Sequence, residues 1–120
     1  MGLFGRKKRG PSPREERREV DEYLSRWVSE HRGVEIYVEP VTTMNPTTVL
    51  LVAHDGEFTR RPVRDTEAAR SFAQEAGLPV YDATVVGYPQ RMRDYSRKQK
   101  ILERRALDAD YDEERGRGVL

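Results

Sequence analysis

The chain has 120 residues, enough for one domain with a real hydrophobic core but too few for two such domains. It contains no cysteine, which excludes disulfide bonds, thiolate chemistry and thiolate metal ligands. Charged and hydrophobic residues each make up 36% of the chain, the net charge is +1, and no apolar run approaches the ~20 residues of a membrane-spanning helix.

The first stretch of the chain is a basic tail. Residues 1–11 are predicted to be disordered, because consecutive cations repel one another and Gly10-Pro11 interrupts any helix. The same stretch lacks the apolar core of roughly 7–15 residues that a secretory signal requires. The sequence therefore predicts a cytoplasmic protein.

A helix is predicted to begin the α+β domain, which we place at residues 12–89. Ser12 can accept the N–H of Glu15 as the N-cap, and Pro13 suits the first helical position because its missing N–H has no partner there. The apolar residues that follow have helical spacing and form one face of an amphipathic helix. They are Val20, Leu24, Trp27 and Val28.

Three strands are predicted next. Residues 34–39 alternate between apolar and polar side chains, which is typical of a strand with one face on a core and one in water. Residues 48–53 are apolar without alternation, which predicts a strand buried on both faces. Asp55-Gly56 is predicted to form a type I′ turn that leads into a third strand over residues 58–63.

A second helix and a fourth strand complete the predicted domain. Asp65 can cap a helix that runs to about Ala76, and Gly77 can end it in the left-handed conformation. Residues 80–86 are then predicted to form a strand. Because one helix connects it to the third strand, a right-handed crossover can place it parallel to the first strand and beside it. The predicted fold class is α+β, a two-layer sandwich of order αβββαβ with both helices on one face.

The remaining residues are predicted to form a charged extension. Residues 90–107 have helical propensity but a poor apolar face, so we expect a basic helix that either docks weakly or stands off the domain. Residues 108–120 are rich in Asp and Glu and are predicted to be a disordered acidic tail.

Cations are concentrated in two places. Residues 1–18 contain seven basic side chains against two acidic ones, and residues 90–105 again contain seven against two. Such blocks could simply keep the ends solvated, but basic ends on an acidic body can also contact an anionic partner.

The sequence thus favours a non-enzymatic binding protein whose partner is a nucleic acid or an anionic protein or ribonucleoprotein surface. The predicted contact residues are Arg6, Lys7, Lys8, Arg9, Arg91, Arg93, Arg97, Lys98 and Lys100. No catalytic residue, metal ligand or cofactor site is predicted, and the oligomeric state is left open.

Two other functions stay open from the sequence alone. The polar face of the first strand, with Glu35, Tyr37 and Glu39, could be a protein-interaction surface. Alternatively, His54, Asp55 and Glu57 lie close together in one hairpin, and oxygen ligands suit Mg²⁺ in a small enzyme. No recognisable active-site motif accompanies them, and the glycines form no phosphate-binding loop.

Three segments carry a resemblance to known proteins. They are Val38-Glu39-Pro40-Val41-Thr42-Thr43, Gly77-Leu78-Pro79-Val80-Tyr81-Asp82 and Val86-Gly87-Tyr88-Pro89-Gln90-Arg91-Met92-Arg93-Asp94. With these motifs, residues 20–95 resemble a group of small actinobacterial proteins of unassigned function. Some members of that group carry an oxidoreductase label from automated naming, but the motifs contain no cofactor site, so the resemblance implies no activity.

Overall fold

The computed structural model describes residues 10–116 of the chain. Residues 1–9 and 117–120 lie outside the described part. The predicted contact residues Arg6, Lys7, Lys8 and Arg9, most of the predicted basic tail and the last residues of the acidic tail are therefore not placed.

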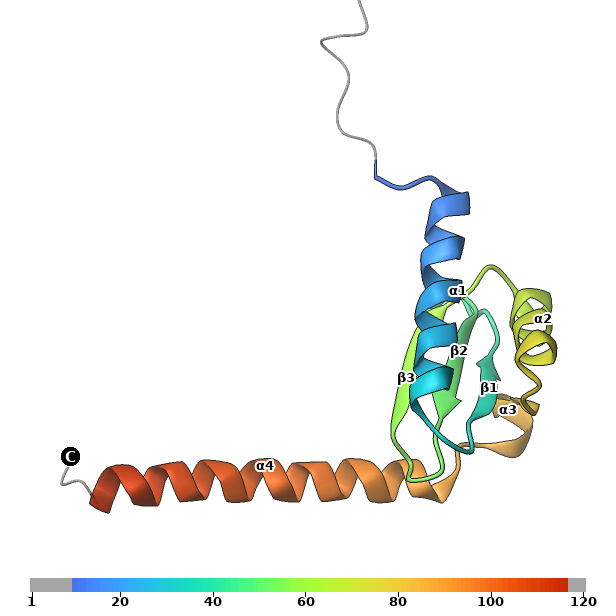
Figure 1. The fold of residues 1–120 in the computed structure, drawn as a ribbon. Helices are drawn as coiled ribbons and strands as arrows, with labels where there is room; N and C mark the ends of the chain where they lie inside the picture. The colour runs from blue at the N-terminus through green and yellow to red at the C-terminus, as the bar shows by residue number, and fades with distance from the viewer. Residues whose placement is uncertain (1–9, 117–120) are drawn as a thin grey trace, which may run out of the picture.

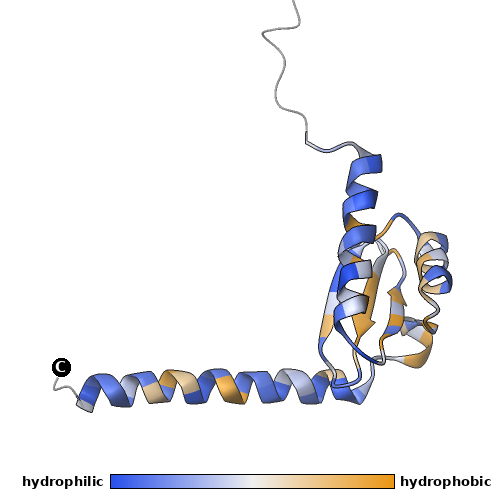
Figure 2. Ribbon diagram, in the orientation of Figure 1, coloured by the Kyte–Doolittle hydropathy of each residue, from blue (hydrophilic) through white to orange (hydrophobic). Residues whose placement is uncertain are grey.

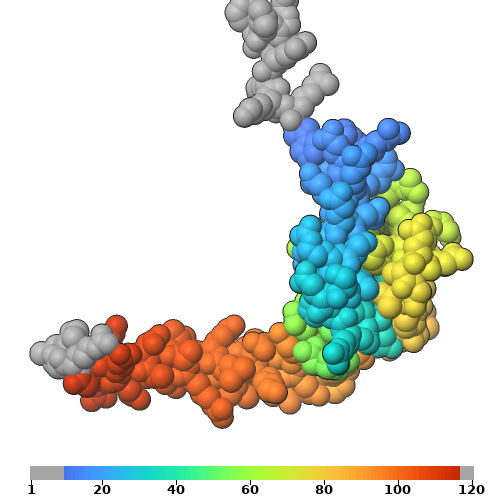
Figure 3. Space-filling model, in the orientation of Figure 1, coloured from blue at the N-terminus to red at the C-terminus, as the bar shows by residue number. Residues whose placement is uncertain are grey.

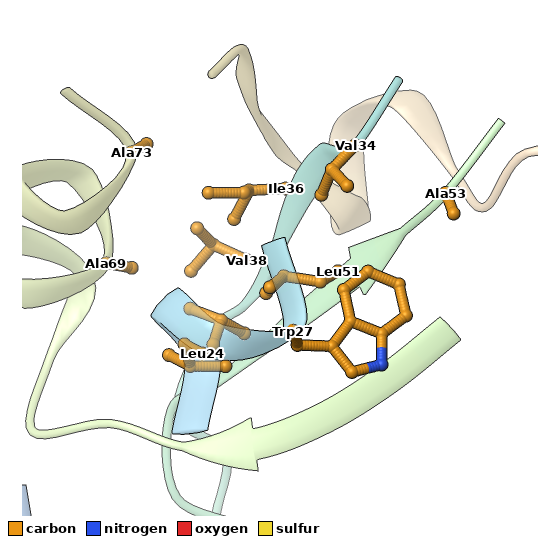
Figure 4. Close-up of a cluster of buried hydrophobic side chains, with 10 residues drawn as sticks. Leu24, Trp27, Val34, Ile36, Val38, Leu51, Ala53, Ala69 and Ala73 are labelled. Carbon is orange, nitrogen blue, oxygen red and sulfur yellow. The ribbon is translucent and has the colours of Figure 1, made fainter. Parts of the chain in front are cut away.

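The first helix, α1 (Pro13–Glu30), begins where the capping signal predicts. The Ser12 hydroxyl oxygen accepts the backbone N–H of Glu15 at 3.2 Å, and Pro13 occupies the first helical position. Leu24 and Trp27 are the buried residues of the helix, and they project toward the sheet (Figure 4). The local signal and the apolar face therefore both fix α1 as predicted.

The sheet contains four strands in the order β3-β2-β1-β4. The strands β1 (Glu35–Glu39), β2 (Thr48–Val52) and β3 (Phe58–Pro62) form an antiparallel meander, and β4 (Val80–Asp82) pairs in parallel with β1 (Figure 1). The crossover from β3 to β4 runs through α2 (Thr66–Ala76), which Asp65 caps and Gly77 ends with a φ of 68°. The predicted α+β fold class and strand arrangement are confirmed.

One face of the sheet carries the main core. The core on this face lies between the sheet and the helices α1 and α2 (Figure 4). The strands contribute Val49 and Leu51 from β2 and Ile36 and Val38 from β1, and α2 contributes Ala69 and Ala73. Small residues on α2 let that helix lie close to the sheet. Both predicted helices therefore cover the same face, as expected.

The opposite face of the sheet is also covered in part. Leu50 and Val52 of β2 pack there with Tyr37, with Ala83 of α3 (Ala83–Val86) and with Met92 of α4 (Gln90–Gly116). β2 is thus enclosed on both sides, as its unbroken apolar run predicts, and residues 49–52 have no exposed surface. The expectation that Tyr37 lies on a wet face is wrong, because the side chain is only 6% exposed.

The last predicted strand is shorter than its sequence suggests. Residues 80–82 pair with β1, but residues 83–86 form α3 instead of continuing the strand. The Asp82 carboxylate accepts the backbone N–H of Thr84 at 2.8 Å and the Thr84 hydroxyl at 2.5 Å. This capping interaction starts a helical turn and overrides the β-branched composition of the segment.

The C-terminal helix is longer than predicted and leaves the domain. Residues 108–116, which the composition assigns to a disordered tail, continue α4 without a break. No glycine or proline interrupts the helix between Gln90 and Arg115. Only its first turns lie against the sheet, and the rest projects from the body as a single rod (Figures 1 and 3).

The β2–β3 hairpin is built around a close approach to α4. Gly56 has a φ of 95°, whereas no other residue type has positive φ in residues 10–116, so Asp55-Gly56 does not form the predicted type I′ turn. A Cβ atom at Gly56 would lie 1.9 Å from the backbone oxygen of Arg91. The glycine is therefore required both by the turn and by the passage of α4 over it.

The same hairpin is tied to the end of α1 through His31. Its Nε2 lies 3.0 Å from a carboxylate oxygen of Glu57, and its Nδ1 lies 2.6 Å from the carbonyl oxygen of Trp27. Burial of His31 opposes its charged form, but the bonds to Glu57 and Trp27 outweigh this, and the pKa of His31 is raised. The imidazole ring also stacks on the Trp27 indole at a centroid distance of 3.6 Å.

We predict that Gly56→Ala destabilises the protein more than a positive φ alone explains. The new methyl group meets the backbone of α4, which cannot move without unseating Met92 and Arg91. The expected extra loss of unfolding free energy is about 2 kcal/mol, the order found for overpacked sites. Chemical denaturation measures the loss, and amide hydrogen exchange in residues 90–96 should rise.

Gly77→Ala is the matched control for this prediction. Gly77 also has positive φ, at 68°, but a Cβ atom there meets nothing within 4 Å. This variant should lose only the backbone term of about 1 kcal/mol. Equal losses in the two variants would contradict the proposed packing of α4 on Gly56.

The His31–Glu57 pair predicts a specific pH dependence of stability. A raised pKa in the folded state means that the contribution is complete below the unfolded pKa of about 6.5 and is lost as the pH rises through the folded value. His31→Gln should therefore cost about 0.5 kcal/mol more at pH 5.5 than at pH 8, a small figure because Glu57 is 39% exposed. Urea denaturation at both pH values tests this, and Glu57→Gln should show the same difference.

Candidate nucleic-acid interface

The start of α4 is fixed to the sheet by Arg91. Its Nε donates a hydrogen bond to the carbonyl oxygen of Ala53 at 2.8 Å, and its Nη2 donates to Glu35 Oε1 at 2.5 Å. The same Nη2 lies 3.4 Å from the carbonyl oxygen of Val52. Arg91 thus caps the end of β2 and pairs with β1, so it serves the fold, and its predicted role as a nucleic-acid contact is not supported by its position.

The next turns of α4 form one wall of a cleft of about 510 Å³ against β3. Three cations line this wall at positions 93, 97 and 100, and this spacing places them on one side of the helix. Phe58 and Arg60 contribute from β3, and Tyr88 comes from the segment that precedes α4. The cleft is lined by Phe58, Arg60, Tyr88, Met92, Arg93, Ser96, Arg97 and Lys100.

Arg93 and Arg97, two of the cations that line the cleft, have side-chain partners on α4 itself. Arg93 donates to the side-chain oxygen of Gln90 at 3.0 Å, and Arg97 lies 3.8 Å from a carboxylate oxygen of Asp94. The Arg97 side chain is 70% exposed, so this ion pair is weak. The guanidinium groups can therefore turn toward an anionic ligand in the cleft at little cost.

Glu39 organises the other wall of the cleft. Its two carboxylate oxygens accept a forked pair of hydrogen bonds from Arg60, at 2.6 and 3.2 Å, and Thr48 donates to it at 2.7 Å. The Tyr88 hydroxyl also donates to this carboxylate. Burial opposes the charged form of Glu39, but these bonds outweigh it and its pKa is lowered.

The same network holds the aromatic ring of the cleft in place. The hydrogen bond to Glu39 and burial together raise the pKa of Tyr88, so the phenol stays protonated as a donor. The residue is nevertheless 40% exposed. An anchored hydroxyl with an accessible ring gives a fixed flat surface next to cations, which is the arrangement on which a base can stack.

A larger groove of about 1090 Å³ between α1 and α2 has the opposite character. Its charged lining contains five carboxylates and two arginines: Glu16, Glu19, Asp21, Glu67, Glu75, Arg17 and Arg64. Burial and the nearby Glu75 raise the pKa of Asp21, while Arg17 opposes this. An acidic groove repels phosphate, so the basic cleft at α4 is the stronger candidate for an anionic ligand.

The structure therefore separates the predicted contact residues. Arg93, Arg97 and Lys100 share the cleft, Lys98 is exposed on another side of α4, and Arg91 is part of the fold. The contribution of Arg60, which lies in the strand predicted over residues 58–63, is not among the contacts predicted from the sequence. No local signal could reveal it, because its place depends on how α4 crosses the distant β3.

The structure also describes the surroundings of the two alternative sites predicted from the sequence, the polar face of β1 and the β2–β3 hairpin. Tyr37 is buried, so the polar face of β1 is not the open surface that the sequence predicts. In the hairpin, Asp55 accepts the N–H of Glu57 at 3.0 Å, and Glu57 itself pairs with His31. Within residues 10–116, no three His, Cys, Asp or Glu side chains are grouped so that they could hold a metal ion.

Comparisons of the chain with protein-family models, with curated proteins and with solved structures found no match. The resemblance to small actinobacterial proteins therefore stays a prediction. Among the helices of residues 10–116, none combines the length and the apolar character needed to cross a membrane.

We predict that Arg91→Lys lowers the unfolding free energy by about 1–2 kcal/mol, because an ammonium group cannot reproduce the fork that reaches Ala53 and Glu35 together. Chemical denaturation measures the loss. Arg93→Lys is the matched control two residues away, where the exposed side chain should change stability by less than about 0.5 kcal/mol. Equal effects of the two substitutions would contradict the structural role assigned to Arg91.

Proposed function

We propose that the cleft between α4 and β3 binds a single strand of nucleic acid. The observation that supports this is the convergence of three cations from α4 with Arg60, Phe58 and Tyr88 on one cleft. Cations along a groove pair with phosphates, and aromatic rings beside them give bases a stacking surface. This proposal narrows the sequence-based expectation of an anionic partner to one ligand class and one surface.

The spacing of the cations suits a short stretch of nucleic-acid backbone. Arg93 and Lys100 lie about 10 Å apart along the helix axis, with Arg97 between them. Their long, exposed side chains can follow successive phosphates without a change in the backbone. Arg60 is already paired with Glu39, so it contributes less charge and mainly fixes the opposite wall.

An aromatic surface favours nucleic acid over an acidic protein surface as the partner. An acidic protein surface would need only the cations of the cleft. The anchored and accessible ring of Tyr88 beside these cations suits a ligand that also carries bases. Such recognition is tolerant of sequence, because every base has a face on which an aromatic ring can stack. Under this proposal the protein is a non-enzymatic binding protein of the cytoplasm.

The experiment is a titration of a fluorescent oligothymidylate with the full chain at several salt concentrations. Each phosphate contact on a single strand contributes roughly −0.7 to the slope of log affinity against log salt. Lys100→Gln should therefore reduce the steepness of this slope by about 0.7. Lys98→Gln, on the same helix but outside the cleft, should leave the slope unchanged.

Two outcomes would overturn the proposal. The first is equal effects of the two lysine substitutions, which would indicate diffuse attraction to a basic chain. The second is equal affinity for polyglutamate of matched charge, because a polymer without bases has nothing to stack on Tyr88. Weaker binding with a shallower salt slope in Lys100→Gln, at a preserved melting temperature, supports it.

A further inference from the structure

The groove between α1 and α2 opens onto the main core of the domain. Val20, Val63 and Phe72 line it, and all three pack against the buried cluster on this face of the sheet. They are only partly buried, so apolar surface stays accessible in the groove. Covering such surface is favourable, because it removes apolar area from water.

Carboxylates surround this apolar surface, and most of them make no ion pair. Of the five acidic side chains in the lining, only Glu67 is paired, with Arg70 at 3.2 Å. The groove therefore combines an apolar surface with carboxylates that a cationic partner can neutralise. The other four form no ion pair with any residue in the described range 10–116: Glu16, Glu19, Asp21 and Glu75.

The two arginines of the lining have other partners. Arg17 donates to a backbone carbonyl oxygen of its own helix, and Arg64 pairs with Asp65. Burial and the charge of Glu75 on the opposite helix raise the pKa of Asp21, although Arg17 lowers it. Asp21 and Glu75 thus repel each other across the groove, and a cation placed between them would be attracted to both.

The residues that precede the described part of the chain carry the complementary groups. Residues 3–9 consist of Leu3, Phe4 and Gly5 followed by four consecutive cations, Arg6, Lys7, Lys8 and Arg9. The segment thus offers two large apolar side chains and four positive charges to a groove with an apolar surface and four carboxylates that make no ion pair. The two sets match in kind and in number of charges.

The segment also has the length and the position that docking requires. The described part of the chain begins at Gly10, and Pro13 already lines the groove. Fully extended, residues 3–9 span about 20 Å, and α1 rises about 17 Å from Pro13 to Leu24. A chain reversal at the turn-forming pair Gly10-Pro11 would lay the cations beside the hydrophilic first turns of α1 (Figure 2) and the apolar pair beside Leu24.

We propose that residues 3–9 of this chain bind in the groove between α1 and α2, with Leu3 and Phe4 on its apolar surface and residues 6–9 among its carboxylates. Because the segment is tethered beside the groove, its effective concentration there is high, and individually weak contacts suffice for binding. The docking gives four of the predicted nucleic-acid contacts, Arg6 to Arg9, a partner within the chain.

The proposed docking is independent of the nucleic-acid cleft. The groove lies on the sheet face that α1 and α2 cover, whereas Phe58 and Met92 of the cleft belong to the cluster on the opposite face. Its test uses nucleic-acid-free protein. The failure of one proposal is therefore distinguishable from the failure of the other.

Paramagnetic broadening of amide signals in the full chain tests the docking. The natural chain has no cysteine, so Gly5→Cys can carry a single nitroxide between the apolar and the cationic parts of the segment. We expect strong broadening in residues 71–76 of α2 and little in residues 93–100 of α4. Broadening confined to residues 10–16 would overturn the docking. Equal broadening of α2 when labelled and observed chains are different molecules would overturn the assignment to the same chain.

Substitutions in the labelled chain test the two kinds of contact. Glu75→Arg should reduce the broadening of α2 about threefold, because attraction of the cations becomes repulsion, and the new arginine can pair with Asp21 so that the fold is kept. Glu30→Arg is the matched control with the same change of charge, since Glu30 is exposed and lies outside the groove. Phe4→Ser should also reduce the broadening. Equal effects of the two arginines, or no effect of Phe4→Ser, would indicate diffuse attraction and overturn the proposal.

Discussion

The enclosure of β2 on both faces is the constraint on which the rest of the structure depends. Residues 49–52 have no exposed surface, and burial of each such side chain contributes about 1.5–3 kcal/mol relative to an exposed position. One sheet face is covered by α1 and α2, but Leu50 and Val52 point to the other and need a second cover. The first turns of α4 and the short α3 provide it. A helix that would otherwise be a solvated extension is thereby anchored to the domain.

The basic cleft follows from the way this second cover is attached. Gly56 lets the backbone of α4 come close, and Arg91 ties the helix to the carbonyl groups at the end of β2. Once α4 crosses the hairpin in this direction, the side of the helix with positions 93, 97 and 100 faces β3 and forms the basic cleft. Without this docking, the cations of α4 would not lie against Arg60 and Tyr88 in one cleft.

The sequence is informative wherever a signal is local. The cap at Ser12, the unbroken apolar run of β2 and the left-handed end of α2 at Gly77 each depend on a few adjacent residues, and all are found as predicted. The strand order also follows from connection lengths and handedness.

The sequence is less informative where distant residues decide the environment of a side chain. Tyr37 looks solvent-exposed by alternation but is covered by elements more than forty residues later in the chain. Arg91 looks like another cation in a basic run, and only its position beside Ala53 and Glu35 shows that it is structural. The end of α4 lies beyond its predicted position, because the acidic composition of residues 108–116 suggests disorder although these residues contain no helix breaker before Gly116.

The continuity of α4 has a mechanical consequence. No loop separates its docked turns from its projecting turns, so α4 is one stiff helix of about 40 Å, docked turns included, whose direction is set at the sheet. Any partner bound at the end of α4 is therefore held at a fixed distance and angle from the cleft, which a flexible linker would not do.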